Sequence, residues 1–482
     1  MAKYTLTARR LGLTALVNPL TTLSNLILLP ILTKNLAVAD YGIWALIMVT
    51  LGMLPWLTTL GLGASMTRFL AAETDKREIQ EGFYSMGFIV LLTSSILFGL
   101  LFLLVQQIAA SLFQNNLTMA LLFILNIWIA CPTIYAMQYY VVFQQIKKNS
   151  FLILFNAYLN TALIASFVLL GYGLKGALIA LLIQQLVTFA VVLYPIVTQI
   201  GFVIPKFRRV REYLSFGLPF LPTAISGWVV NSSDRYLIAF FLGEAAVGYY
   251  SPGYVLGSIL GMVAQPLAIL LPPVLFKHYD AGEIADVRTI ITYSLKYYSG
   301  IILPCVFAVS VLSTPLLLVL TTKEIAENGY FVTPLVAAGA AVYGAQSLIL
   351  LILMLEKRTA VIGVIWVLVA VFNFGLNLVL IPYLGLIGAA LTTFLALLLG
   401  FVISVQYSLK LFTFDVNYGF IVKSVFGSCI VALFLFLMNP SGVLSIVLSI
   451  ALAAAIYLTI LLVLRGLTIQ EIKLIYRIYK GS

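Results

Sequence analysis

The chain is a series of long hydrophobic stretches, separated by short clusters of charged, Gly, Pro and Asn residues. A helix needs about 20 consecutive apolar residues to cross the hydrocarbon core of a bilayer. The breaks between stretches predict about fourteen transmembrane helices and an all-α integral membrane fold. These helices are expected over residues 11–33, 41–66, 83–105, 117–140, 150–172, 176–198, 214–242, 246–272, 291–321, 330–354, 359–382, 386–409, 418–438 and 443–464.

Composition and charge support a membrane protein. The chain is 62% hydrophobic and 9% charged, whereas a soluble domain carries about 25% charged residues. The first apolar run continues to Leu32 without a cleavage site. It is therefore longer than a signal peptide allows, and we expect it to be retained as a span.

The net charge of +11 is explained by where the basic residues lie relative to the predicted spans. With the N-terminus inside, most of the 27 Lys and Arg residues fall in cytoplasmic segments, and only Lys34, Lys175 and Lys323 fall outside. This bias predicts a multi-pass protein of the cytoplasmic (inner) membrane with both termini in the cytoplasm. It also removes the need for a nucleic-acid partner.

Two halves of the chain resemble each other. LAVADYGIWAL aligns with LGEAAVGYYSP so that Gly42 falls on Gly248, and GLKGALIALL at Gly173 aligns with GLIGAALTTF at Gly385. The alternative is that Gly and aromatic residues after any span look alike. A repeat of six helices predicts two lobes in the same orientation, related by pseudo-twofold symmetry around a central cavity. The expected domains are 1–205 (helices 1–6), 206–412 (helices 7–12), and 413–482 with helices 13–14 and a basic cytoplasmic tail.

The stretches LPILTKNLAVADYGIWAL, LGLGASMTRFLAAE and DRYLIAFFLGEAAVGYYSPGY, with the GLKGA and GLIGA turns, carry a family resemblance over essentially the whole chain. The chain resembles the polysaccharide transporter family, which includes the O-antigen and capsule repeat-unit flippases. The resemblance implies the fold of the multidrug/oligosaccharidyl-lipid/polysaccharide superfamily and alternating access. It also implies a lipid-linked oligosaccharide substrate on undecaprenyl diphosphate or a related polyprenyl carrier, for surface polysaccharide biosynthesis. Membrane lipids and a polysaccharide polymerase or other assembly protein are the expected partners.

Two full charges, Asp234 and Arg235, lie inside the seventh predicted helix. Each costs about 2.5–3.5 kcal/mol near the centre of a membrane helix, and such residues usually face the bundle interior or a water-filled cavity. Neighbours in a helix point about 100° apart, so we expect that the two charges do not simply neutralise each other. Arg235 lies roughly 12 Å inside the helix end at Gly243, in the outer half of the membrane.

Two roles for this pair remain open. In the first, each residue binds a polar partner on a neighbouring helix and fixes the packing. In the second, Arg235 faces the cavity and binds the diphosphate or acidic sugars, because its planar fork donates two hydrogen bonds and stays charged. Asp234 then orients Arg235 or takes up H⁺ or Na⁺, which is the only coupling cofactor that we expect.

Four further polar residues are candidates for substrate binding. Arg68 and Lys296 could line a basic vestibule for a diphosphate, although basic residues at helix ends are common and Lys can snorkel. Asn25 and Asn231, which the repeat aligns, could bind sugar hydroxyls or join helices by hydrogen bonds.

The alternatives to a glycan flippase are an ion-coupled multidrug exporter and a lipid II flippase of the same fold. A cation exporter needs an intramembrane carboxylate, and the first six predicted helices have none at depth. An enzyme is not expected, because the sequence has no P-loop, no metal-binding His or Cys cluster and no long polar loop with paired carboxylates.

Overall fold

The computed structural model describes residues 2–466, and it describes side chains from residue 17 onward. The predicted basic tail therefore lies outside the described residues from residue 467 on. The described part of the chain divides into two compact units, the first ending at Gly248 and the second beginning at Tyr249. The lobe boundaries predicted from the repeat stay a prediction.

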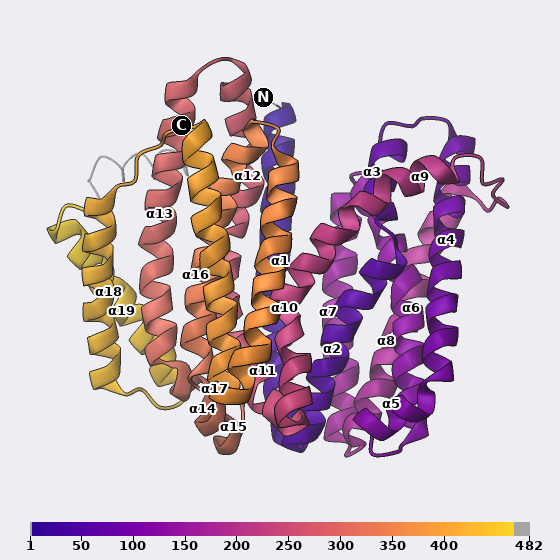
Figure 1. Ribbon diagram of the computed structural model, residues 1–482, viewed down its shortest axis with the longest axis horizontal. Helices are drawn as coiled ribbons and strands as arrows, with labels where there is room; N and C mark the ends of the chain where they lie inside the picture. The colour runs from indigo at the N-terminus through magenta and orange to yellow at the C-terminus, as the bar shows by residue number, and fades with distance from the viewer. Residues whose placement is uncertain (1, 467–482) are drawn as a thin grey trace. The chain divides into compact units, whose positions relative to one another are not determined.

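The first unit is a bundle of helices (Figure 1). Here α1 lies along α7, α6 packs against both α4 and α8, and α2 packs against α6 and α10. The helices are α1 (Ala2–Asn35), α2 (Val38–Thr58), α3 (Leu62–Leu70), α4 (Lys76–Leu103), α5 (Val105–Leu112), α6 (Leu117–Val142), α7 (Ile146–Leu169), α8 (Gly173–Ile200), α9 (Val210–Gly217), η1 (Leu218–Phe220) and α10 (Leu221–Leu242).

Small polar residues hold α1 against α7. The Ser24 hydroxyl lies 3.0 Å from the Ala157 carbonyl oxygen and 2.6 Å from the Thr161 hydroxyl. In hydrocarbon, apolar contacts between helices gain little over contacts with lipid, so small residues and interhelical hydrogen bonds make the interface.

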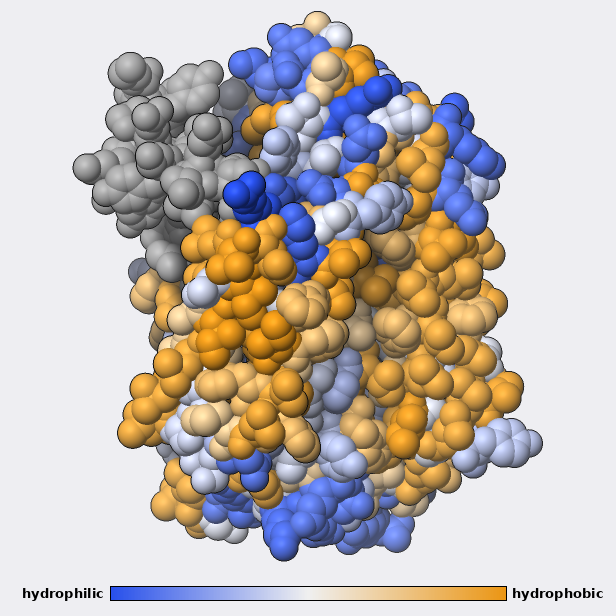
Figure 2. All heavy atoms as spheres, turned by 90° about the vertical axis from the view of Figure 1, so that its left-hand side faces the viewer, coloured by the Kyte–Doolittle hydropathy of each residue, from blue (hydrophilic) through white to orange (hydrophobic). Residues whose placement is uncertain are grey.

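The second unit follows α11 (Glu244–Ser258), which crosses the boundary between the units. In it, α13 packs against α16 and α18, α16 against α17, and α18 against α19. Figure 2 shows a broad hydrophobic band between hydrophilic ends on this side of the molecule. The helices are η2 (Ile259–Val263), α12 (Gln265–Asp280), α13 (Ile284–Val311), α14 (Ser313–Leu320), α15 (Lys323–Gly329), α16 (Val332–Leu355), α17 (Thr359–Leu411), α18 (Tyr418–Met438) and α19 (Val443–Val463).

The helices confirm the predicted all-α membrane class. Among the described residues, twelve helical segments are long and apolar enough to cross a membrane. The 53-residue α17 is one of these segments, but its backbone leaves the helical conformation at Gly385, so it holds two of the predicted spans. With α17 counted twice and α1 added, the structure agrees with the prediction of about fourteen.

The aligned GLKGA and GLIGA turns adopt the same unusual backbone. Gly173 begins α8 with φ +57°, and Gly385 breaks α17 with φ +60°. Side chains other than hydrogen disfavour positive φ, which is why Gly stands at both positions. This shared conformation is what an internal repeat predicts.

Candidate functional site

Asp234 and Arg235 are buried on α10 and bind each other. Asp234 is fully buried and Arg235 is 7% exposed. The Arg235 guanidinium donates to the Asp234 carboxylate at 3.2 Å and to the Asn231 carbonyl oxygen, one turn earlier, at 2.9 Å. The expectation that the neighbouring charges do not neutralise each other is therefore wrong. Their Cα–Cβ directions diverge, but the long Arg side chain folds back along the helix to reach the carboxylate.

Helix α2 positions the face of α10 that carries this pair. The Trp228 indole N–H donates to the Val49 carbonyl oxygen at 3.2 Å, and the Tyr236 hydroxyl bonds to Thr50. Tyr41, which is also on α2, interacts electrostatically with Arg235. Sequence reasoning did not single out these α2 residues, because neither a Thr nor a Tyr in an apolar span is unusual.

A cavity of about 410 Å³ lies elsewhere in the first unit, where α2, α3, α6 and α10 come together. Its wall combines aromatic rings with hydroxyl and amide groups, the mixture that orients a ligand in a largely apolar pocket. The residues that give it this character are Trp56, Thr59, Thr67, Tyr135, Gln138, Phe220 and Thr223. The cavity is separated from the ion pair, because Ala224 in its wall is ten residues, or roughly 15 Å, before Asp234 on α10.

The other candidate residues of the first unit are spread over three helices. Arg68 is exposed on α3 and directly follows Thr67, which lines the cavity. Asn25 is exposed on α1, and Asn231 is exposed on α10, where its side-chain amide donates to the Gly227 carbonyl oxygen at 2.7 Å. Of the candidates, the structure thus brings together Asp234, Arg235 and the backbone of Asn231.

Lys296 belongs to the second unit and is only 9% exposed. Its ammonium nitrogen lies 5.6 Å, 5.7 Å and 5.2 Å from the ring centroids of Tyr293, Tyr297 and Phe420, respectively. Ring faces attract a cation at this range. The rings come from α13 and α18, so Lys296 contributes to the packing of these two helices.

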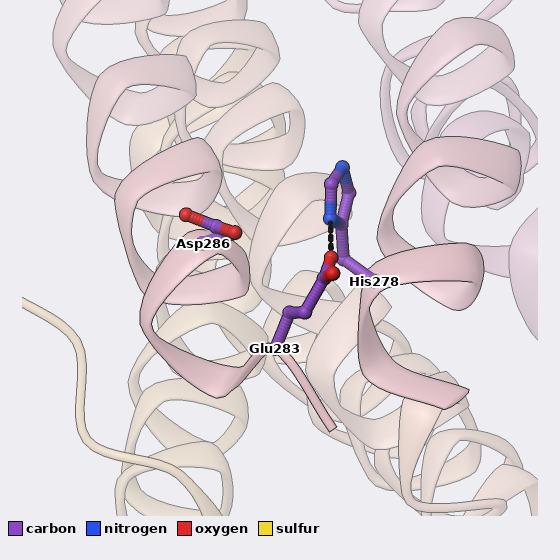
Figure 3. Close-up of side chains that lie close together, drawn as sticks. All are labelled: His278, Glu283 and Asp286. Carbon is purple, nitrogen blue, oxygen red and sulfur yellow. Dashed lines mark hydrogen bonds and ion pairs between the residues drawn. The ribbon is translucent and has the colours of Figure 1, made fainter. Parts of the chain in front are cut away.

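One group among the described residues has metal-ligand chemistry. His278 bonds to Glu283, and the ligand atoms of these residues and Asp286 all lie within 4.8 Å of one another (Figure 3). Glu283 stands at the N-cap position of α13 without a side-chain capping hydrogen bond, and Asp286 stands in the first turn, where the helix dipole favours carboxylates. The Glu283 carboxylate bonds to His278, and both acids are exposed, so the group carries no argument for a metal site.

The described helices thus define a multi-pass α-helical membrane protein with buried charges in its spans. The family described as polysaccharide biosynthesis protein matches residues 8–278, which is more than half of the chain. The chain belongs to this family, as the sequence resemblance indicates.

Curated relatives agree with this assignment. The chain is 23% identical over 309 residues to the probable low-salt glycan biosynthesis flippase Agl15 of Haloferax volcanii, covering 61% of this chain and 63% of the relative. It is 27% identical over 212 residues to the probable flippase AglR of the same organism, covering 40% and 44%. The chain thus matches less than two thirds of the length of these relatives.

The fold is that of known transporters. The lipid II flippase MurJ, in an inward closed conformation, superposes with a TM-score of 0.73 at 17% identity, over 92% of this chain and 97% of that one. A multidrug resistance MATE family transporter of the MOP superfamily, in an inward-facing conformation, gives a TM-score of 0.67 at 17% identity, over 81% and 95%.

Proposed function

We propose that this protein is a flippase that moves polyprenyl-diphosphate-linked oligosaccharides from the inner to the outer leaflet of the cytoplasmic membrane by alternating access. Family membership and the names of the two relatives support a flippase of glycan biosynthesis. The repeat unit is assembled for a surface polysaccharide, such as O-antigen, capsule or exopolysaccharide. A polysaccharide polymerase or another assembly protein then receives it.

The observation that carries the proposal is the sign of the buried charge. Among the buried residues of the described part, the charged ones are Asp234, Arg235 and Lys296, two cations and one anion. Each unit therefore buries a cation, and a buried cation fits a diphosphate better than an organic cation. An exporter of cationic drugs, in contrast, needs a carboxylate that is not already bound to an arginine.

The buried pair also supplies a candidate for energy coupling. We infer that Asp234 exchanges its bond to Arg235 for H⁺ or Na⁺ when the diphosphate takes over the guanidinium. Asp234 and Arg235 then separate only when the cation binds the carboxylate and the diphosphate binds the guanidinium. This exchange avoids an unpaired charge in the membrane.

The test is a deletion strain complemented with the chain. We expect the deletion to stop export of the surface glycan and to accumulate lipid-linked repeat units in the inner leaflet, and we expect the chain to reverse both effects. Unchanged glycan with altered drug tolerance would instead identify an exporter. Accumulation of lipid II with cell lysis would identify a lipid II flippase.

A further inference from the structure

The second unit contains a cavity of about 630 Å³ that the proposed transport does not use. It lies between α13, α16, the end of α17 and the start of α18. Its wall is almost wholly apolar, with Leu295, Ile302, Ala345, Phe401 and Val405 among the lining residues.

Two of the polar side chains in this wall are already bonded within the protein. The Tyr298 hydroxyl donates to the Ala341 carbonyl oxygen at 2.8 Å, and the Ser299 hydroxyl donates to the Lys296 carbonyl oxygen at 2.8 Å. A water molecule needs two to four polar partners, and an engineered apolar cavity of about 150 Å³ stays dry and takes up apolar molecules instead. The cavity is therefore suited to a hydrocarbon occupant rather than to water.

Two exposed basic residues adjoin the lining, one in sequence and one through a neighbouring ring. Lys410 directly follows the lining residue Leu409, and the Arg288 guanidinium lies 5.5 Å from the ring centroid of Phe412. Phe412 packs in one cluster with Phe414 and Ile349, which line the cavity. Asp415 is the acidic residue of the lining, so the two exposed cations outweigh it.

We propose that this cavity binds one hydrocarbon chain of an anionic membrane phospholipid, whose phosphate lies near Arg288 and Lys410. The occupant must come from the bilayer, because the lining helices are membrane spans. The volume suits a single acyl chain, whereas a polyprenyl carrier chain is several times longer. The lipid chain would contact the apolar wall of this cavity and gain dispersion contacts there. This inference does not rest on the proposed function.

The experiment measures lipid retention by the purified full-length protein. The protein is washed in detergent to remove bound lipid and is then incubated with phosphatidylglycerol or phosphatidylcholine of equal chain length. Native mass spectrometry measures how many lipid molecules stay bound. We expect wild type to retain one phosphatidylglycerol and Ala345→Phe, which fills the cavity, to lose it. Ala454→Phe adds the same ring at an exposed position of α19 and should retain the lipid. Arg288→Gln with Lys410→Gln should abolish the preference for phosphatidylglycerol.

Three outcomes would overturn the proposal. The first is that Ala345→Phe retains as much lipid as wild type. If Ala345→Phe does not fold, Val405→Phe is used in its place. The second is displacement of phosphatidylglycerol from wild type by polyprenyl phosphate, which would make the carrier chain the occupant. The third comes from crosslinking wild type to a phospholipid with a photoreactive group in its chain. Labelling must fall on α13, α16, α17 or α18, and labelling confined to other helices refutes the site.

Discussion

The buried ion pair on α10 is costly, and its geometry indicates how the protein limits the cost. Removing one partner of a buried pair typically destabilises a protein by about 3–5 kcal/mol, because the other charge stays buried and unpaired. Arg235 also donates to the Asn231 carbonyl oxygen, and Asp234 accepts the backbone N–H of Arg235. These contacts within α10 supply both charges with partners inside the protein.

Substitutions at Asp234 and Arg235 separate transport from folding. Arg235→Ala should lose both export and protein level, because the buried Asp234 carboxylate would lose its ion pair. Arg235→Lys should keep the protein level and part of the export, since Lys keeps the charge but lacks the two-pronged donor. The matched control is the double variant Asp234→Asn with Arg235→Gln, which removes both charges together. We expect it to accumulate normally and to export no glycan, measured by an export assay beside a quantitative membrane blot. Normal export by the double variant would show that the pair serves packing alone.

The sequence showed where the buried charged residues lie along the chain, but it did not show which residues they contact. Two charges in an apolar span could be found by inspection, as could the basic Lys296. That Arg235 folds back onto Asp234, and that three rings surround Lys296, depends on side-chain rotamers and on which helices become neighbours. Neither follows from hydropathy. The 410 Å³ cavity was missed for the same reason, because its wall comes from four helices that are far apart in sequence.

Helices α2 and α11 cross at two glycines that the repeat aligns with each other. A Cβ atom on Gly42 would collide with the Glu244 carbonyl group, and one on Gly248 would collide with the Val38 carbonyl group. The backbones therefore touch directly, as small residues allow in membrane helices.

A methyl group at this crossing should push the helices apart. We expect Gly42→Ala to lower thermal stability, because overpacking costs typically about 1–3 kcal/mol and outweighs the gain of up to about 1 kcal/mol in helix propensity. The control is Gly52→Ala on the same helix, where nothing lies within 4 Å of the added methyl. That variant should be as stable as wild type or slightly more so. Equal melting temperatures for the two variants in detergent would contradict a backbone-to-backbone crossing.

The break in α17 tests the second pair of aligned glycines. Gly385 has φ +60° and ψ −137°, and no atom lies within 4 Å of the place that an alanine methyl would take. Gly385→Ala should therefore destabilise through backbone strain alone, by about 1–3 kcal/mol. Gly375→Ala, in the helical part of α17 and equally uncrowded, should not. The measurement is the melting temperature of the two variants. A Gly385→Ala variant that melts at the same temperature as Gly375→Ala would mean that the turn relaxes to a helix.

Hydropathy predicted the spans well because each must bury about 20 residues in lipid, whatever its partners. It did not predict where spans break. The expected helix 41–66 ends at Thr58 and restarts as α3 at Leu62, with positive φ at Leu60 and Gly61. Gly61 also packs so closely on Gly217 that a Cβ atom would collide with the Gly217 carbonyl group. Such a contact between distant segments cannot be read from a local hydrophobic run.

Topology is the property of the whole chain on which the transport proposal depends, since a flippase must present its entrance to the leaflet where the substrate is made. The charge bias predicts that the α1–α2 and α5–α6 loops lie outside and the α6–α7 loop inside. The test uses three variants of a chain from which Cys131, Cys305 and Cys429 have been removed. Each variant carries one new cysteine, at the exposed position of Ala37, Asn115 or Lys148.

In intact cells, an impermeant maleimide should label the variants at Ala37 and Asn115, because both positions are exposed at loops predicted to lie outside. The variant at Lys148 should react only after the membrane is opened, which also controls for its intrinsic reactivity. Each variant must first restore glycan export, so that a misfolded chain cannot give a false orientation. Labelling at Lys148 in intact cells would place the α6–α7 loop outside. The number of crossings before α7 would then no longer be even, and the common orientation of the two repeats would be lost.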